Sequence, residues 1–140
     1  MNTHTFGVKQ TALAALGILG AVRGLSYIDP PAIPAGLRTL AQVPNLDFWA
    51  WAWVIIGGIS LIGAFTSHYR APFVPLMVIT SLWASSYFAE WCMDIFVRGI
   101  DSRDYITAVS YAVQALLILA VIRLIDPSEV HAPGGDRDVD

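Results

Sequence analysis

Charged residues are scarce in this sequence: only 14% of its 140 residues are charged, against about 25% in an average soluble domain. Apolar residues make up 56%, which is more than a water-soluble globule of this size can easily bury. The net charge of −3 argues against a face that binds nucleic-acid phosphates. The composition therefore excludes an ordinary soluble enzyme, a disordered chain and a nucleic-acid binder, and it favours a small membrane protein.

Residues with catalytic or metal-binding chemistry are also few. Cys92 is the single cysteine, which excludes an internal disulfide and any multi-cysteine metal or redox motif. The three histidines do not have the spacing of a metal site. The chain contains no Ser-His-Asp pattern, phosphate-binding loop or HExxH sequence. We therefore expect neither enzymatic activity nor a metal or cofactor.

What the sequence does contain is four long apolar stretches, at about residues 10–28, 48–66, 72–96 and 105–125. Each is close to the roughly 20 residues that a helix needs to cross about 30 Å of hydrocarbon. Helix is the expected state, because backbone groups in lipid must be satisfied within the segment. We predict an all-α integral membrane protein, in which residues 1–127 form a compact bundle of four transmembrane helices and residues 128–140 form a disordered acidic tail.

Proline residues and polar turns separate these stretches. The sequence Asp29-Pro30-Pro31 ends the first stretch. Asn45 offers an N-cap for the second helix, and Pro72 suits the first turn of the third. The connection at residues 67–72 is short, so the second and third helices are expected to form a hairpin.

Tryptophans gather at one face of the predicted membrane domain, beside the long proline-rich loop: Trp49, Trp51, Trp53 and Trp91. Indole side chains favour the membrane interface, so we interpret them as an anchoring belt, with an aromatic ligand site as the alternative.

The orientation in the membrane follows from the number of spans, because four crossings place both termini on the same side. The weak asymmetry of basic residues and the long, external-looking loop favour a cytoplasmic location for both termini.

Ionisable residues within the apolar stretches are the candidates for a functional site, because a charge at such depth normally pairs or faces water. Glu90 and Asp94 lie four residues apart on one face of the third helix. Arg23 falls at a similar depth on the first, parallel helix, so a contact between Arg23 and Glu90 is geometrically possible. Asp94 lies nearer the interface and is expected to be solvated. The predicted intramembrane polar cluster consists of Arg23, Glu90, Asp94, Ser85 and Gln114. It could fix helix packing, or it could line a pore or gate.

Small residues form a predicted helix-packing seam on three of the stretches, at Gly17, Gly20, Gly24, Ser60, Ala64, Ser81 and Ala89. Residues 20–24 match the GxxxG pattern. Such stripes allow the backbones of two helices to approach closely. The contact can be made within one chain or between copies of the chain, and the second case predicts a homo-oligomer.

The overall plan resembles the holin-like membrane proteins in the lysis cassettes of phages that infect actinobacteria. The shared features are a short chain, closely spaced apolar stretches, the hairpin turn at residues 67–72, glycine- and alanine-rich helices, and the charged tail that ends at residues 135–140. Four spans exceed the one to three that are common in holins. The resemblance implies accumulation in the host inner membrane, lateral homo-oligomerisation in the lipid bilayer, and timed permeabilisation that frees an endolysin.

Two other functions stay open at this stage. The chain could be a non-catalytic membrane anchor, assembly partner or exclusion factor that binds a membrane or cytoplasmic protein. It could also be a small channel or transporter that uses Arg23 and Glu90. Transporters usually contain repeats or broken helices near the middle of the membrane, and this sequence shows neither clearly.

Overall fold

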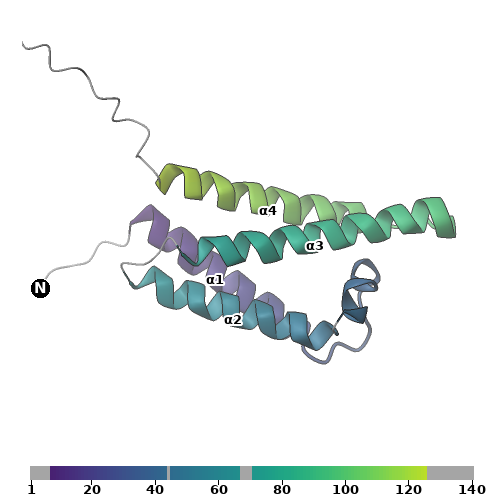
Figure 1. Cartoon of the computed structure of the whole chain (residues 1–140), viewed down its shortest axis with the longest axis horizontal. Helices are drawn as coiled ribbons and strands as arrows, with labels where there is room; N and C mark the ends of the chain where they lie inside the picture. The colour runs from purple at the N-terminus through teal and green to yellow at the C-terminus, as the bar shows by residue number, and fades with distance from the viewer. Residues whose placement is uncertain (1–6, 44, 67–70, 126–140) are drawn as a thin grey trace, which may run out of the picture.

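The structure is a computed structural model that describes residues 7–43, 45–66 and 71–125. In this part of the chain it contains four α-helices and no strand (Figure 1). The helices are α1 Val8–Ser26, α2 Leu46–Ala64, α3 Phe73–Met93 and α4 Asp104–Ile125. The all-α prediction is confirmed, and each helix coincides closely with one predicted stretch. The predicted tail at 128–140 lies outside the described residues.

The ends of α1 and α2 follow from local chemistry. The Asn45 side chain accepts a hydrogen bond of 2.8 Å from the backbone N–H of Phe48, as expected of an N-cap. Beyond the end of α1, Asp29 has a φ of 49°, in the left-handed region. Since the residue that follows is Pro30, the chain cannot continue as a helix here.

The end of α3 is less regular than the sequence suggests. The helix continues as a π-helical turn, η3, from Asp94 to Arg98. Gly99 then adopts a φ of 66°, a conformation that glycine reaches without strain. The N–H of Ile100 closes the turn by donating to the carbonyl of Asp94 over 2.9 Å. The turn continues the helical path of α3, and it therefore places Arg98 within reach of Glu90 and Asp94.

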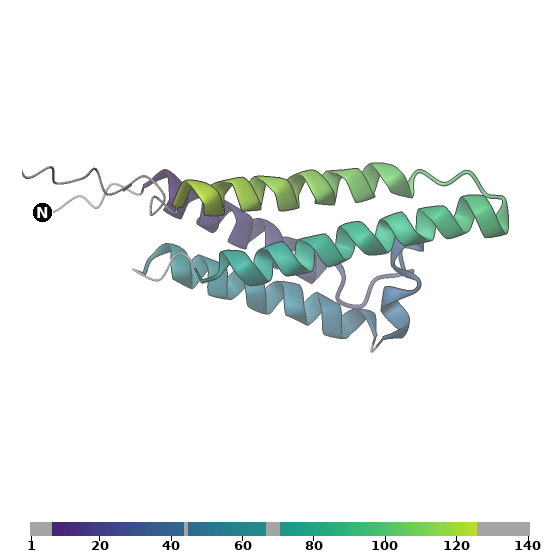
Figure 2. The ribbon, with the colours of Figure 1, turned by 45° about the horizontal axis from the view of Figure 1, so that its top comes forward.

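The helices are arranged as two closely packed pairs, α1 with α2 and α3 with α4 (Figures 1 and 2). Glycine allows the first pair its close approach. A Cβ atom at Gly57 would lie 2.5 Å from the backbone nitrogen of Ala21, and one at Gly24 would lie 2.7 Å from the carbonyl oxygen of Ala50. Because no side chain fits in these gaps, the glycine stripe of α1 is used within the chain.

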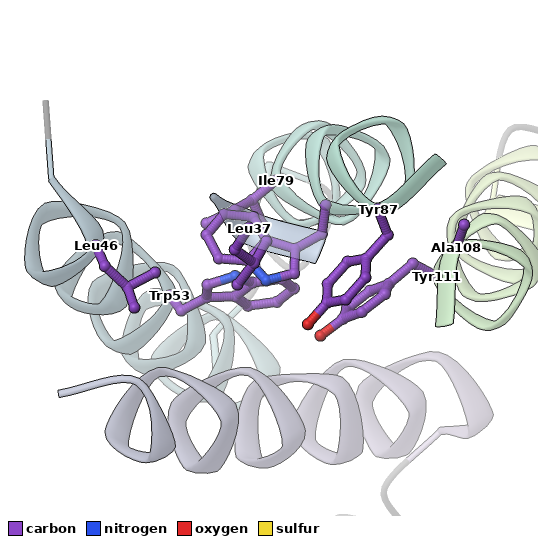
Figure 3. Close-up of a cluster of buried hydrophobic side chains, with 8 residues drawn as sticks. Leu37, Leu46, Trp53, Ile79, Tyr87, Ala108 and Tyr111 are labelled. Atoms are coloured by element: carbon purple, nitrogen blue, oxygen red, sulfur yellow. The ribbon is translucent and has the colours of Figure 1, made fainter. Parts of the chain in front are cut away.

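Two clusters of buried apolar residues hold the pairs together. The larger one is rich in aromatic residues and lies toward the end of the bundle where the loop between α1 and α2 packs (Figure 3). Its buried members are Leu37, Leu46, Trp53, Ile79, Trp83, Tyr87, Ala108 and Tyr111. The smaller cluster consists of Leu13, Ala64, Phe73, Leu76 and Ile118, so all four helices contribute to it.

The loop between α1 and α2 folds back onto the bundle through two short 3₁₀ helices, η1 Ala35–Leu37 and η2 Leu40–Gln42. Leu37 is fully buried in the aromatic cluster. A Cβ at Gly36 would lie 1.9 Å from the ring of Tyr87, so glycine is required at this contact. The hydroxyl of Ser86 donates to the Gly36 carbonyl over 3.0 Å. The loop is therefore part of the folded core and closes one end of the bundle.

The outer surfaces of the helices are strongly apolar. Exposed large side chains include Val22, Ile62, Val78 and Leu116 on the four helices, and each is more than half exposed. By length and hydropathy, two helices in the described residues could cross a membrane: Leu46–Ala64, with a mean hydropathy of 1.6, and Asp104–Arg123, with 2.1. The apolar part of α1, Gln10–Ser26, is shorter. These two helices favour a membrane protein by composition alone, whereas four spans stay a prediction.

Candidate functional site

The first of two polar groups inside the bundle surrounds Arg23, in the last turn of α1. Nη1 of Arg23 donates a hydrogen bond of 2.9 Å to Oε1 of Gln114, near the middle of α4. The guanidinium also lies over two aromatic rings, with its Cζ 4.2 Å from the ring centre of Tyr111 and 5.5 Å from that of Trp53. Such cation–π contacts are stronger where water is excluded. This group therefore links α1 to α2 and α4 through one cation.

Aromatic residues continue the Arg23 group into the core. The hydroxyls of Tyr27 and Tyr111 lie 3.4 Å apart, and the Tyr111 ring stacks on Tyr87 with centroids 5.9 Å apart (Figure 3). Trp53 and Trp83 meet edge to face, with centroids 5.5 Å apart. Both indole N–H groups are buried and have no hydrogen-bond partner among the described residues. We call Arg23, Gln114, Tyr27, Tyr111 and Trp53 the Arg23 cluster.

The second polar group is built on the acidic residues at the end of α3. Glu90 is 1% exposed, yet its carboxylate is fully engaged. Its Oε1 accepts from the backbone N–H of Thr39 over 2.9 Å and also from the Thr39 hydroxyl, while its Oε2 accepts from Arg98 over 3.0 Å. Glu90 thus ties the loop between α1 and α2 to the end of α3. We call Glu90, Asp94, Arg98, Thr39 and Arg38 the Glu90 cluster.

Asp94 is the shared anion of this cluster. Its Oδ1 accepts from Nη1 of Arg98 over 2.5 Å, and Nη1 of Arg38 lies 3.6 Å away. These hydrogen bonds with Asp94, and then with Glu90, raise the pKa of the Arg98 guanidinium above its ordinary value. The prediction that Asp94 is solvated is wrong: the residue is 3% exposed, because η3 and the docked loop bring two arginines over it.

The predicted polar cluster is therefore split in two. Arg23 meets Gln114, and Glu90 lies beside Asp94, but no ion pair joins Arg23 to Glu90 within the described part of the chain. Similar depth on parallel helices did not bring them together, because each finds closer partners. Ser85 belongs to neither group: it is exposed, and its hydroxyl donates to the Ser81 carbonyl of its own helix over 2.9 Å.

Several members of the two clusters were not predicted from the sequence. Arg98 could have been found, since it follows Asp94 by four residues and Glu90 by eight, on the same helical face. Thr39 and Arg38 had no such signal, because they reach the cluster only through the docked loop. Tyr27 and Tyr111 were equally hidden, since their role depends on how α1 and α4 are rotated about their axes.

The tryptophans do not form one belt. Trp51 is exposed and Trp49 and Trp91 are partly buried, which is compatible with a place at a membrane interface. Trp53 contradicts the prediction, because it is fully buried in the aromatic cluster. The helical spacing explains this difference. Trp49 and Trp53 are four residues apart and share the face of α2 that packs against the core, whereas Trp51 lies on the opposite face.

The predicted small-residue seam also divides by location. Gly17, Gly20 and Gly24 face α2, and Ser60 and Ala64 are buried. Ser81 and Ala89 are exposed on α3. On the outer face of the second helix pair, Ser81 and Ser85 border shallow grooves whose walls are otherwise mostly apolar; the further lining residues include Ala84, Phe88, Ala108, Val109, Ala112 and Leu116. The seam thus serves packing inside the chain on α1 and α2 and leaves a small-residue surface on α3.

Comparison with known proteins adds no assignment. No protein-family model, curated protein or solved structure matches the chain. Within the described residues, no group of three or more His, Cys, Asp or Glu side chains could hold a metal ion. The two polar clusters and the apolar exterior are the distinctive features of the described residues.

Proposed function

We propose that all four helices cross a lipid bilayer and that both chain termini lie on the same side. The observation that supports this is the distribution of polarity, with apolar side chains outside and Arg23, Gln114, Thr80 and Glu90 between the helices. The helices contain 19, 19, 21 and 22 residues, which corresponds to about 28–33 Å and matches a hydrocarbon core of about 30 Å. Polar residues lower the hydropathy of α3; of these, Thr80 and Glu90 are buried in the bundle, whereas Ser81 and Ser85 are exposed.

Within that bilayer, we propose a holin-like role: the chain accumulates in a bacterial inner membrane, oligomerises and permeabilises it. A water-filled lesion requires polar residues along its wall, and Arg23 and Gln114 lie between the two helix pairs. Arg23 and Gln114 join α1, from one pair, to α4, from the other, by one side-chain hydrogen bond. If the helix pairs separate in an oligomer, the hydrogen bond between Arg23 and Gln114 is replaced by hydrogen bonds from both side chains to water.

Controlled expression in a bacterium tests this proposal. Wild-type chain is expected to cause a sudden loss of membrane potential, followed by entry of a normally excluded dye. Arg23→Leu is expected to change the time of onset, because it removes the charge that favours a hydrated interior. Arg123→Leu makes the same exchange at an exposed residue near the end of α4 and should leave the onset unchanged. Healthy growth at full expression of the wild type would contradict the permeabilising role.

A second candidate function is a non-catalytic membrane partner of another protein. The grooves beside Ser81 and Ser85 favour it, because exposed small residues allow a foreign helix to approach α3 and α4 closely. Under this proposal the cells grow normally at full expression. Replacement of Ser85 by Phe would then disturb the partner complex while leaving the membrane potential intact. The same expression experiment therefore separates the two candidates.

A further inference from the structure

Arg23 carries a charge that has no acidic partner in the described part of the chain. The ion pairs found there join Arg38 and Arg98 to the carboxylates of Glu90 and Asp94. All contacts of Arg23 are with neutral groups: the amide oxygen of Gln114 and two aromatic rings. A charge within a membrane normally pairs with an opposite charge or reaches water or headgroups. Binding of an anion would therefore stabilise the Arg23 guanidinium.

Arg23 has hydrogen-bond donors that are not used within the described residues, and the residue is partly exposed. A guanidinium has five N–H donors, and one side-chain hydrogen bond is found for this one, to Gln114. Among residues 7–43, 45–66 and 71–125, the fully buried side-chain nitrogen and oxygen atoms without a hydrogen-bond partner belong to Trp53, Trp83, Ser102 and Asp104, and not to Arg23. Since the Arg23 side chain is only partly buried, its remaining N–H groups are not completely enclosed by the protein.

Gln114 adds further donors at the same place. Its amide oxygen accepts from Arg23, so its amide nitrogen, which can only donate, points elsewhere. This nitrogen is also not among the buried unpartnered atoms. Arg23 and Gln114 together present accessible N–H donors from α1 and α4 and no acidic oxygen beside them. A site of this kind suits an anion with several oxygen atoms.

The depth of Arg23 indicates which anion can reach it. Arg23 lies in the last turn of α1, three residues before its end at Ser26. The helix has 19 residues, about 28 Å, which is slightly shorter than a hydrocarbon core of about 30 Å. A short span is accommodated by local thinning of the bilayer and by side chains that extend toward the interface. The phosphate of a lipid in the adjacent leaflet is then an anion that the long Arg23 side chain can approach.

We propose that Arg23 and Gln114 bind the phosphate of an anionic phospholipid headgroup in the leaflet at the C-terminal end of α1. The planar guanidinium matches two phosphate oxygens with parallel N–H donors, and the amide of Gln114 supplies a further donor. An anionic lipid is favoured over a zwitterionic one, because its phosphate has no ammonium group to neutralise it. This inference rests on the membrane location proposed above and is independent of permeabilisation.

Titration of the full-length chain in detergent micelles tests this site. The probes are short-chain phosphatidylglycerol, short-chain phosphatidylcholine and inorganic phosphate, and the signal is tryptophan fluorescence, since Trp53 lies beneath Arg23. We expect saturable binding of phosphatidylglycerol that is tighter than binding of either other probe. Arg23→Leu should weaken it roughly tenfold to hundredfold, as loss of hydrogen bonds to a charged group does. Arg123→Leu should bind like the wild type.

Two further variants guard against a folding artefact. Arg23→Lys retains the charge and loses the paired donors, so its affinity should fall between those of wild type and Arg23→Leu. Gln114→Leu removes only the neutral donor and should weaken binding less. Each variant is checked for helix content by circular dichroism. Wild-type affinity in well-folded Arg23→Leu, or tighter binding of inorganic phosphate than of the lipid, would overturn the assignment.

Failure of this inference can be told apart from failure of the membrane location. A chain that stays monomeric and helical in buffer without detergent contradicts the proposed membrane bundle, whatever it binds. A chain that requires detergent but binds the three probes equally contradicts the lipid site alone.

Discussion

Two charged residues between the helices, the partly exposed Arg23 and the buried Glu90, are accommodated in different ways. Glu90 has two charged or charge-assisted partners on its carboxylate, from Arg98 and Thr39, and it is almost completely buried. Arg23 has one neutral hydrogen-bond partner and two aromatic rings. The carboxylate of Glu90 has all its partners within the chain, whereas Arg23 is partly exposed and retains donors without a partner in the described residues.

The difference indicates separate roles for the two clusters. The Glu90 cluster joins the end of α3 to the docked loop, and Arg98 comes from the same helical segment as both carboxylates. We call this arrangement a clasp, because its hydrogen bonds and ion pairs hold the loop between α1 and α2 against the end of α3. The Arg23 cluster joins residues 91 positions apart in the sequence, on two helices that belong to different pairs. We propose that the bundle opens or binds a headgroup at the Arg23 cluster, whereas the Glu90 cluster serves stability.

Removal of Arg98 is expected to have the largest effect on stability. Arg98→Met leaves Glu90 and Asp94 close together with a single arginine, Arg38, at 3.6 Å from Asp94. Breaking a buried ion pair from one side is strongly destabilising, because the remaining charge stays desolvated. We expect the midpoint of thermal unfolding in detergent, followed by circular dichroism, to fall by on the order of 10 °C.

The matched control is Arg103→Met, at an exposed arginine that forms no ion pair within the described residues. Its midpoint should stay close to that of the wild type. Equal shifts for the two variants would mean that the Glu90 cluster does not act as a clasp.

Loss of the Thr39 hydroxyl should have an intermediate effect. Thr39→Val removes one of the two hydrogen bonds that this residue donates to Glu90 and keeps the one from its backbone N–H. A hydrogen bond to a charged group contributes about 1.5–3 kcal/mol, so we expect a loss of unfolding free energy in this range. Titration with sodium dodecyl sulfate measures it. Thr39→Ser retains the hydroxyl and should recover most of the stability; a loss as large in Thr39→Ser would contradict the hydrogen-bond explanation.

The sequence could predict where the helices lie but not how they are rotated. Apolar length, the Asn45 cap and the Asp29-Pro30-Pro31 break were sufficient to place four helices. The partner of Arg23 depends on which side of α1 faces α4, and that is set by the close packing of α1 on Gly57 of α2. The glycine stripe marks the packing face of α1 in the sequence, but it does not show that α2 is the helix packed against this face. Depth along a helix alone suggested Glu90 instead.

The Glu90 cluster was half predictable for a related reason. The spacing of Glu90, Asp94 and Arg98 places all three on one helical face, and this pattern is visible in the sequence. The part that could not be predicted is the docking of the loop. Leu37 enters the aromatic core and carries Thr39 to Glu90, and the required space exists only because Gly36 lies against Tyr87. Tertiary contacts of this kind leave no local pattern.

Gln114→Leu should have the smallest effect on stability, although it breaks a side-chain hydrogen bond between the two helix pairs. Side-chain hydrogen bonds between helices in a bilayer contribute about 0.6 kcal/mol on average, because the separated helices find other partners. Arg23 retains its two aromatic contacts in this variant, and its freed donors can turn to headgroups or water. We therefore expect a loss below about 1 kcal/mol in the same detergent titration, and a coupling of similar size in a double-mutant cycle with Arg23→Leu. A coupling as large as the Thr39→Val effect would show that Arg23 and Gln114 form a second clasp, and the distinction between a closed and an open charge site would then be lost.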